Sequence, residues 1–241
     1  MVIVLKVDST IIASDTLNPI PGGPLIYNQQ STHTFTVPCN LTSGLHNICC
    51  YTTDPNGVND NDPVDDTLCK TITVLDSTSN FPYCNDFESG TNWFSSNAVN
   101  YELAGSWELG DPNKVYLGNA HSGIKSWVTR LVGNYSNSDN SALFSTIFNV
   151  DSGNCYNLSF WRKYYTQSSH DGCAVGYSTD NGNSWQVLGA INDPVNWMNS
   201  GNVSALNSAG WSGLASTWTQ SSHIYTCNQT GTVLFLSLIH I

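Results

Sequence analysis

The sequence predicts an all-β protein made of two sandwich modules. Three observations predict this class: short stretches of alternating apolar and polar residues, clusters of Gly, Pro, Asn and Asp between them, and the absence of an amphipathic helical pattern. Regular short strands with polar turns are typical of β-sandwiches. The expected strands are Val2–Val7, His33–Val37, His46–Thr52, Leu68–Leu75, Cys155–Trp161, Ala174–Tyr177, Trp185–Leu188 and Thr217–Cys227.

Composition supports folded modules and narrows the range of partners. The 241 residues are 40% hydrophobic and 11% aromatic, which is enough to build cores. With 18 acidic and 7 basic residues the net charge is -11, so the surface repels nucleic acid and anionic membranes. Calcium, which binds carboxylate and carbonyl oxygens, is the first cofactor candidate.

A polar segment divides the chain. Asp76–Asn80 has no apolar anchor and precedes an aromatic run, which predicts a first module over 1–76, a linker over 77–80 and a second module over 81–235. The last six residues, 236–241, resemble one reading frame of a common sequencing adapter. We expect them to be a non-native scar, with the natural strand ending near Phe235, because an apolar end would form an unprotected edge strand. A genuine apolar strand is the alternative.

The cysteines indicate an oxidising compartment. None of the eight forms a paired C-x-x-C knuckle of the zinc-binding kind, so disulfides are the better interpretation. Cys49 or Cys50 could reach Cys69 if their strands pair, and the two adjacent cysteines would point to opposite faces. We therefore expect a secreted or cell-surface protein whose signal peptide lies outside this chain.

The first module contains a hairpin pattern. Gly44–Tyr51 alternates, Asp54-Pro-Asn-Gly57 and an acidic stretch follow, and Thr67 to Leu75 closes the pair. This order resembles the last hairpin of the immunoglobulin-like adhesion modules of bacterial surface proteins. The resemblance implies a seven-stranded sandwich that serves as a spacer or adhesive unit.

The loop of this hairpin is a weaker calcium candidate. Clustered carboxylates repel one another unless a cation or solvent separates them. Their spacing does not match the D-x-[DN]-x-[DN]-G loop, so a solvated hairpin tip is the favoured interpretation. The carboxylates are Asp54, Asp60, Asp62, Asp65 and Asp66.

The second module carries an ordered set of short motifs. They include Tyr83-Cys-Asn-Asp-Phe-Glu-Ser-Gly90, Ser106-Trp-Glu-Leu-Gly110, Asn119-Ala-His-Ser-Gly123, Leu158-Ser-Phe-Trp161 and Gly210-Trp-Ser-Gly213. The succession resembles the MAM-like jelly-roll domains of secreted Bacteroidetes-type proteins and immune-inhibitor-type peptidases. The resemblance implies a concanavalin-like sandwich that accompanies peptidases, adhesins or glycan-active enzymes.

The same resemblance implies a structural cation. In that family the acidic pair of the opening motif, which Asp86 and Glu88 match, helps to hold a cation that carboxylates near the last strand complete. Here the completing residues would lie beyond Phe235. Strand alternation would place both carboxylates on one face and Phe87 on the other. Two exposed acids beside a core Phe are the alternative.

Ser178–Trp185 matches the Asp-box pattern S-x-D-x-G-x-[ST]-W. The pattern predicts a tight structural turn in which Asp180 accepts backbone hydrogen bonds, Gly182 supplies a positive φ and Trp185 packs beneath. Sialidases carry several such boxes with an arginine cluster. This chain has one box and only the arginines Arg130 and Arg162.

Eight tryptophans suggest a carbohydrate ligand. Trp161 and Trp185 lie in alternating strands and are expected to be buried, whereas Trp197 and Trp211 lie in a stretch rich in Asn, Ser and Gly and are expected to be exposed. Trp197 and Trp211 are therefore the predicted ligand-binding residues, with core filling as the alternative.

The sequence contains no catalytic motif of the metallopeptidase, serine-hydrolase or nucleotide-binding kind. The leading hypothesis is a non-catalytic accessory or adhesion region that binds glycan or protein at the cell surface, within a larger multidomain bacterial protein. The second is the non-catalytic tail of a secreted metallopeptidase. The third is a glycan-active jelly-roll enzyme, for which Glu102 and Glu108 are the remaining glutamates.

Overall fold

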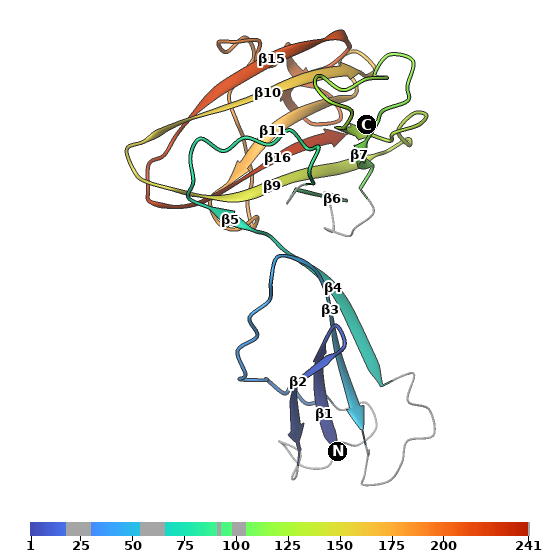
Figure 1. Ribbon diagram of the computed structural model, residues 1–241, viewed down its shortest axis with the longest axis vertical. Coiled ribbons are helices and arrows are strands. Elements are labelled where there is room, and N and C mark those ends of the chain that lie inside the picture. Colours follow the sequence, from blue (N-terminus) through green and yellow to red (C-terminus); the bar gives the residue numbers. More distant parts are fainter. Residues whose placement is uncertain (18–29, 54–65, 91–92, 98–104, 241) are drawn as a thin grey trace. The chain divides into compact units, whose positions relative to one another are not determined.

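The computed structural model describes residues 1–17, 30–53, 66–90, 93–97 and 105–240. The chain divides into two compact units, Met1–Leu75 and Asp76–Ile241 (Figure 1). All regular structure in the described residues is strand, which confirms the all-β class. The division falls beside the predicted linker, but Ser77–Thr78 of that linker form strand β5 and pair with the second unit.

The first unit contains one antiparallel sheet in the order β2-β1-β3-β4. Its strands are β1 (Val2–Val7), β2 (Thr10–Thr16), β3 (Gly44–Thr53) and β4 (Thr67–Val74). The predicted strand His33–Val37 is wrong, since these residues have no regular structure. Four strands in the described part are fewer than the seven of an immunoglobulin-like sandwich.

A disulfide joins the two strands of the predicted hairpin. Cys49 on β3 lies opposite Cys69 on β4, and their sulfurs are 2.09 Å apart. Cys50 instead lies opposite Leu68 and keeps a half-buried thiol. Of the two pairings left open by the sequence, the strand register selects Cys49, because neighbouring side chains point to opposite faces.

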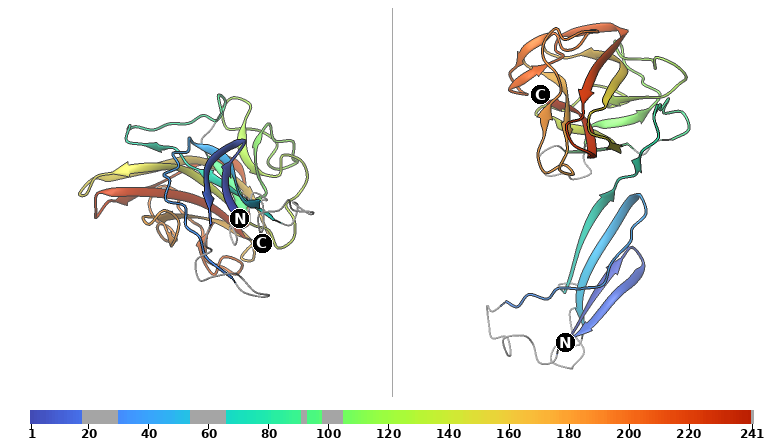
Figure 2. Two further views of the ribbon diagram at one scale, coloured as in Figure 1. Left: turned by 90° about the horizontal axis from the view of Figure 1, so that it is seen from below. Right: turned by 90° about the vertical axis from the view of Figure 1, so that its left-hand side faces the viewer.

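The second unit is built from two layers (Figures 1 and 2). One layer is a sheet in the order β12-β11-β16-β9-β5, with β6 also on β9, and the other is the long antiparallel pair β10-β15. Two short hairpins, β7-β8 and β13-β14, complete the unit. The bounds are β6 (Phe94–Asn97), β7 (Trp107–Gly110), β8 (Ser126–Thr129), β9 (Asn140–Val150), β10 (Cys155–Tyr165), β11 (Gly172–Ser178), β12 (Gln186–Val187), β13 (Ser200–Val203), β14 (Ser208–Gly210), β15 (Leu214–Thr226) and β16 (Gly231–His240).

The core of this unit lies between the two layers. Apolar side chains of β9, β11 and β16 meet those of β10 and β15 there. On β10 the even-numbered Leu158 and Phe160 pack against this core, so the odd-numbered residues of the strand face away from it. The outward face of β10 and β15 is therefore free to carry side chains that the core does not use.

Residues 236–240, assigned from the sequence to a non-native scar, are part of the folded sheet, while their origin stays a prediction. They continue β16, which lies between β11 and β9 and is not an edge strand. Leu236 and Ile239 are buried, and Leu236 pairs with Gly176 on one side and Phe144 on the other. The apolar residues of this segment are covered by neighbouring strands, which removes the edge-strand argument.

Candidate functional site

The two tryptophans predicted to bind a sugar are core residues. Trp197 is 1% exposed and Trp211 is 2% exposed. Their rings are 5.1 Å apart in an edge-to-face arrangement, and both contact Phe160. The indole N–H of Trp197 donates to the Leu188 carbonyl at 2.8 Å. The ring faces and indole N–H groups of Trp197 and Trp211 contact residues inside the unit. Both residues therefore fill the core, which was the alternative interpretation.

A half-buried arginine bonds to the polar segment that covers these tryptophans. The Arg162 guanidinium lies 5.0 Å from the centre of the Trp211 ring. It donates to the Ser221 hydroxyl and to the Asn196 carbonyl, both at 2.7 Å. A cation over an indole face is attractive, and the hydrogen bonds tie β10 to the segment that contains Trp197.

Exposed aromatic rings gather on the outward face of the β10-β15 layer. The large aromatic side chains exposed by 45% or more in the described residues are Phe81 (45%), Tyr116 (47%), Trp161 (45%) and Tyr165 (49%). Trp161, expected to be buried, is thus exposed, while Trp185 is half-buried. We define the aromatic platform as Tyr116, His121, Trp161, Tyr165 and Trp218.

The register of β10 places two platform residues on one line. Trp161 and Tyr165 have the same parity and project from the outward face. Residues four positions apart on a strand are separated by about 13 Å. The two rings can therefore contact different parts of an extended ligand.

A bulge places Trp218 beside them. Arg162 pairs with Thr219 and Tyr164 with Ala215, so β15 covers four positions where β10 covers two. The additional residues of β15 lie between Ala215 and Thr219, in the segment that contains Trp218. Bulges commonly re-aim side chains next to functional sites.

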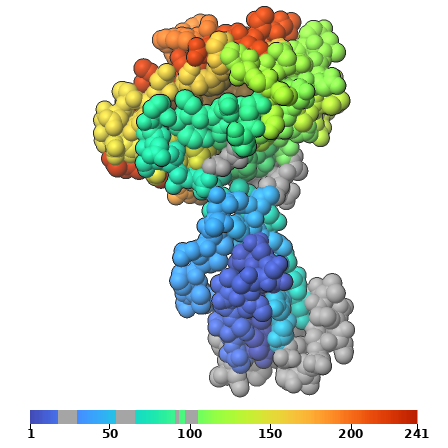
Figure 3. Space-filling model, in the orientation of Figure 1, coloured from blue at the N-terminus to red at the C-terminus, as the bar shows by residue number. Residues whose placement is uncertain are grey.

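The segment before β8 supplies the other two rings. Tyr116 packs on Tyr165 with ring centres 4.5 Å apart. His121 stacks on Trp161 at 3.9 Å with an interplanar angle of 14°, and its edge faces Trp218 at 6.0 Å. In Figure 3 this segment, coloured light green, lies beside the yellow surface of β10. Residues distant in sequence thus form one aromatic surface.

Hydrogen-bonding groups lie among the rings. The Lys163 ammonium donates to the Asn119 side-chain carbonyl at 2.8 Å and lies 5.8 Å from the centre of the Trp218 ring. The Gln220 amide donates to the Ser159 hydroxyl at 3.0 Å. Aromatic faces with a few fixed polar groups are suited to a ligand that has apolar faces and polar edges.

The predicted calcium pair is engaged with backbone. The Glu88 carboxylate accepts the N–H groups of Ile124 (2.9 Å) and Lys125 (2.7 Å), and the Asp86 carboxylate accepts the N–H of Glu88. Phe87 has a φ of 62°, so the expected strand alternation is wrong. Through these hydrogen bonds Glu88 connects its own loop to the turn before β8.

The acidic loop of the first unit lies largely outside the described residues. Asp54, Asp60, Asp62 and Asp65 fall there, and Asp66 is described and half-buried. In the part of the chain that the structure describes, no three His, Cys, Asp or Glu side chains are grouped closely enough to hold a metal ion. Calcium binding stays a prediction.

The Asp-box residues form a tight hairpin turn. Asp180 accepts the backbone N–H and the hydroxyl of Ser184, at 2.9 and 2.5 Å, and the hydroxyl of Ser178 at 2.7 Å. Gly182 has a φ of +87°, and its N–H donates to the Ser178 hydroxyl. Trp185 contacts Phe144 on β9 with ring centres 5.7 Å apart. The turn anchors the β11-β12 connection to the sheet.

The Asp180 carboxylate should make unfolding pH-dependent. Hydrogen bonds from Ser184 and Ser178 lower its pKa from 3.8 to about 2. Because the folded-state pKa is the lower one, the ionised carboxylate stabilises the turn above about pH 4, and this contribution is lost as the pH falls toward 2. Between pH 5 and pH 2, the midpoint temperature of thermal unfolding should fall more steeply for the wild type than for Asp180→Asn. Parallel curves would show that the turn does not depend on this charge.

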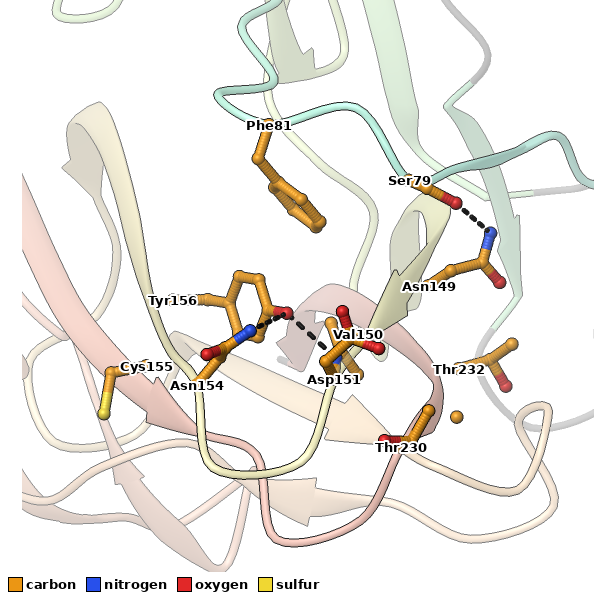
Figure 4. Close-up of a pocket in the computed structure, with 11 residues that line it drawn as sticks. Ser79, Phe81, Asn149, Val150, Asp151, Asn154, Cys155, Tyr156, Thr230 and Thr232 are labelled. Atoms are coloured by element: carbon orange, nitrogen blue, oxygen red, sulfur yellow. Dashed lines mark hydrogen bonds between the residues drawn. The ribbon is translucent and has the colours of Figure 1, made fainter.

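A cleft of about 650 Å³ opens at one end of the second unit, beside the β9-β10 and β15-β16 turns (Figure 4). The Tyr156 hydroxyl accepts from the Asp151 backbone N–H at 2.9 Å, and Phe81 packs on the Tyr156 ring at 4.8 Å. Asn149 donates to Ser79 at 3.2 Å. Several polar groups of the cleft thus form hydrogen bonds with other lining residues. The lining has one carboxylate, Asp151, one thiol, Cys155, and no histidine that would activate either.

Comparisons of the chain with protein-family models, curated proteins and solved structures each found no match. The function of the chain is therefore argued from its residues and their geometry. None of the described residues belongs to a helix that could cross a membrane.

Proposed function

We propose that this chain is a non-catalytic accessory or adhesion region of a secreted or cell-surface multidomain bacterial protein, and that its second unit binds glycan through the aromatic platform. The observation that carries the proposal is the clustering of exposed rings. Three of the four most exposed large aromatics of the described residues lie on this one surface, together with Asn, Gln, Ser and Lys side chains.

The chemistry of the surface favours a saccharide. A sugar ring presents C–H groups on its faces and hydroxyl groups at its edge. The faces would pack on Trp161 and Trp218, and the hydroxyl groups would bond to Asn119 and Gln220. Rings fixed by contacts with one another lose little conformational entropy when they bind a ligand.

We also propose that the first unit is an immunoglobulin-like spacer and that the second unit is a MAM-like jelly roll. An immunoglobulin-like spacer followed by a MAM-like jelly roll accounts for a small disulfide-linked unit joined to a larger two-layer unit. The Cys49–Cys69 disulfide supports a location outside the reducing cytosol. Further domains of the parent chain would supply any catalysis, as in the peptidase-tail alternative. The hypothesis of a glycan-active enzyme loses the support of Trp197 and Trp211, because both residues are buried.

Removal of one platform ring tests the proposal. Trp161→Ala should weaken binding to the best ligand of a polysaccharide panel by about tenfold or more, since truncation of an aromatic hot-spot residue costs about 2 kcal/mol or more and about 1.4 kcal/mol is a factor of ten. Affinity electrophoresis with the full chain measures the change. Ile224→Ser is the control, because Ile224 lies on β15, the strand that pairs with β10, and is 59% exposed but outside the platform.

Unchanged binding by Trp161→Ala, or an equal loss in both variants, would contradict the proposal. The second outcome would indicate general hydrophobic adsorption on this face of the sheet. An absence of binding to every polysaccharide, combined with binding to a protein ligand, would favour protein adhesion.

A further inference from the structure

We infer that the aromatic platform selects anionic saccharides, those with carboxylate or sulfate groups, and that Lys163 is the specificity-determining residue. This inference rests on the proposed glycan-binding function. It follows from the charge of the surface and from the position of a single ammonium group.

The segments that carry the platform contain no acidic residue, although the protein as a whole is strongly acidic. The chain has a net charge of -11, yet β10, β15 and residues 115–121 contain no Asp or Glu. Glu88 lies beside Gly123, and its carboxylate accepts the N–H groups of Ile124 and Lys125. An anionic ligand would therefore meet little repulsion here, although it is repelled by the protein as a whole.

Lys163 is one of only seven Lys and Arg residues, and it projects among the exposed rings. Its ammonium group has three N–H donors. One donates to Asn119, and two remain for ligand oxygens. The Asn119 bond and the nearby Trp218 ring hold the cation beside the stacking surface, where a ligand on the rings would place its acidic group.

The hydrogen bond to Asn119 holds the Lys163 ammonium at the platform. Elsewhere in the second unit, lysines are engaged by backbone: Lys114 donates to the Thr129 carbonyl at 2.6 Å and Lys125 to the Glu88 carbonyl at 2.9 Å. Lys163 bonds to a side-chain carbonyl, and within the described residues it forms no salt bridge, so no carboxylate competes with the ligand for it. A charge-assisted hydrogen bond to an anionic sugar is about twice as strong as a neutral one.

The test compares three ligands on the full chain: polygalacturonate for carboxylates, dextran sulfate for sulfates, and dextran as the neutral polymer. The wild type should bind at least one anionic polymer about tenfold more tightly than dextran, and added salt should reduce this preference. Lys163→Gln should lower the anionic affinity about tenfold and the dextran affinity much less, so that the ratio of the two affinities falls. Lys163→Arg should retain the preference. Lys70→Gln, in the first unit, removes the same charge and should have no effect.

The two proposals fail separately. If dextran and the anionic polymers bind equally and Trp161→Ala weakens both, the platform binds glycan and the selection of anions is wrong. An equal effect of Lys163→Gln and Lys70→Gln would assign the preference to net charge and would also overturn the inference. Binding of no polymer would overturn both proposals. Preference for polygalacturonate over dextran sulfate, or the reverse, identifies which acidic group is selected.

Discussion

Trp197→Ala should lower the free energy of unfolding of the second unit by about 3–5 kcal/mol, the usual cost of removing a large buried aromatic side chain. Trp197 is 1% exposed and lies against Trp211, Phe160 and His223, so the cavity would open in the middle of the core. The Leu188 carbonyl would also lose its indole donor. A loss of this size is a large part of the total stability of an ordinary domain.

Chemical denaturation followed by circular dichroism measures this change on the full chain. Trp161→Ala is the matched control, because it removes the same side chain from the exposed platform and should change stability much less. If the two variants were equally stable, the division of tryptophans into core and surface sets would be wrong.

The double variant Cys49→Ser, Cys69→Ser should destabilise the first unit by about 3 kcal/mol, because the disulfide closes a loop with a sequence separation of 20 and restricts the unfolded chain. Among the described residues of this unit, the only buried apolar side chains are Val4, Val7, Ala13 and Cys49 itself, so little else offsets the loss. Small units of this kind depend strongly on covalent links.

Limited proteolysis and denaturation in oxidising buffer should show earlier unfolding of the first unit in this variant. Cys50→Ser is the control, since Cys50 lies next to the bridge but keeps a free thiol. Equal protection in both variants would mean that the sheet is stable without its disulfide.

Strands with an alternating pattern could be predicted from the sequence, whereas the long central strand β9 could not. β10 and β3 alternate, and their positions were predicted closely. Asn140–Val150 was missed, because β9 is covered on both faces and its Ser141, Ser145 and Thr146 are buried. Alternation disappears in a strand of this kind.

The tryptophans show the corresponding limit for the site. A polar stretch was expected to expose Trp197 and Trp211, but its polar groups bond to one another: Asn199 and Ser212 exchange two hydrogen bonds of 3.0 Å. A polar segment can therefore cover a core when its partners lie far apart in sequence. Trp161 carried a usable signal, since Leu158 and Phe160 set the inward parity of β10.

Indole N–H signals in a ¹⁵N NMR spectrum of the full chain test the central claim most directly. Trp161→Phe and Trp218→Phe would assign the platform signals, and Trp197→Phe and Trp211→Phe the core signals. Titration with an oligosaccharide of the best polymer should shift the Trp161 and Trp218 signals and leave those of Trp197 and Trp211 in place. A shift of the Trp197 and Trp211 signals with no change at Trp161 and Trp218 would contradict glycan binding at the platform.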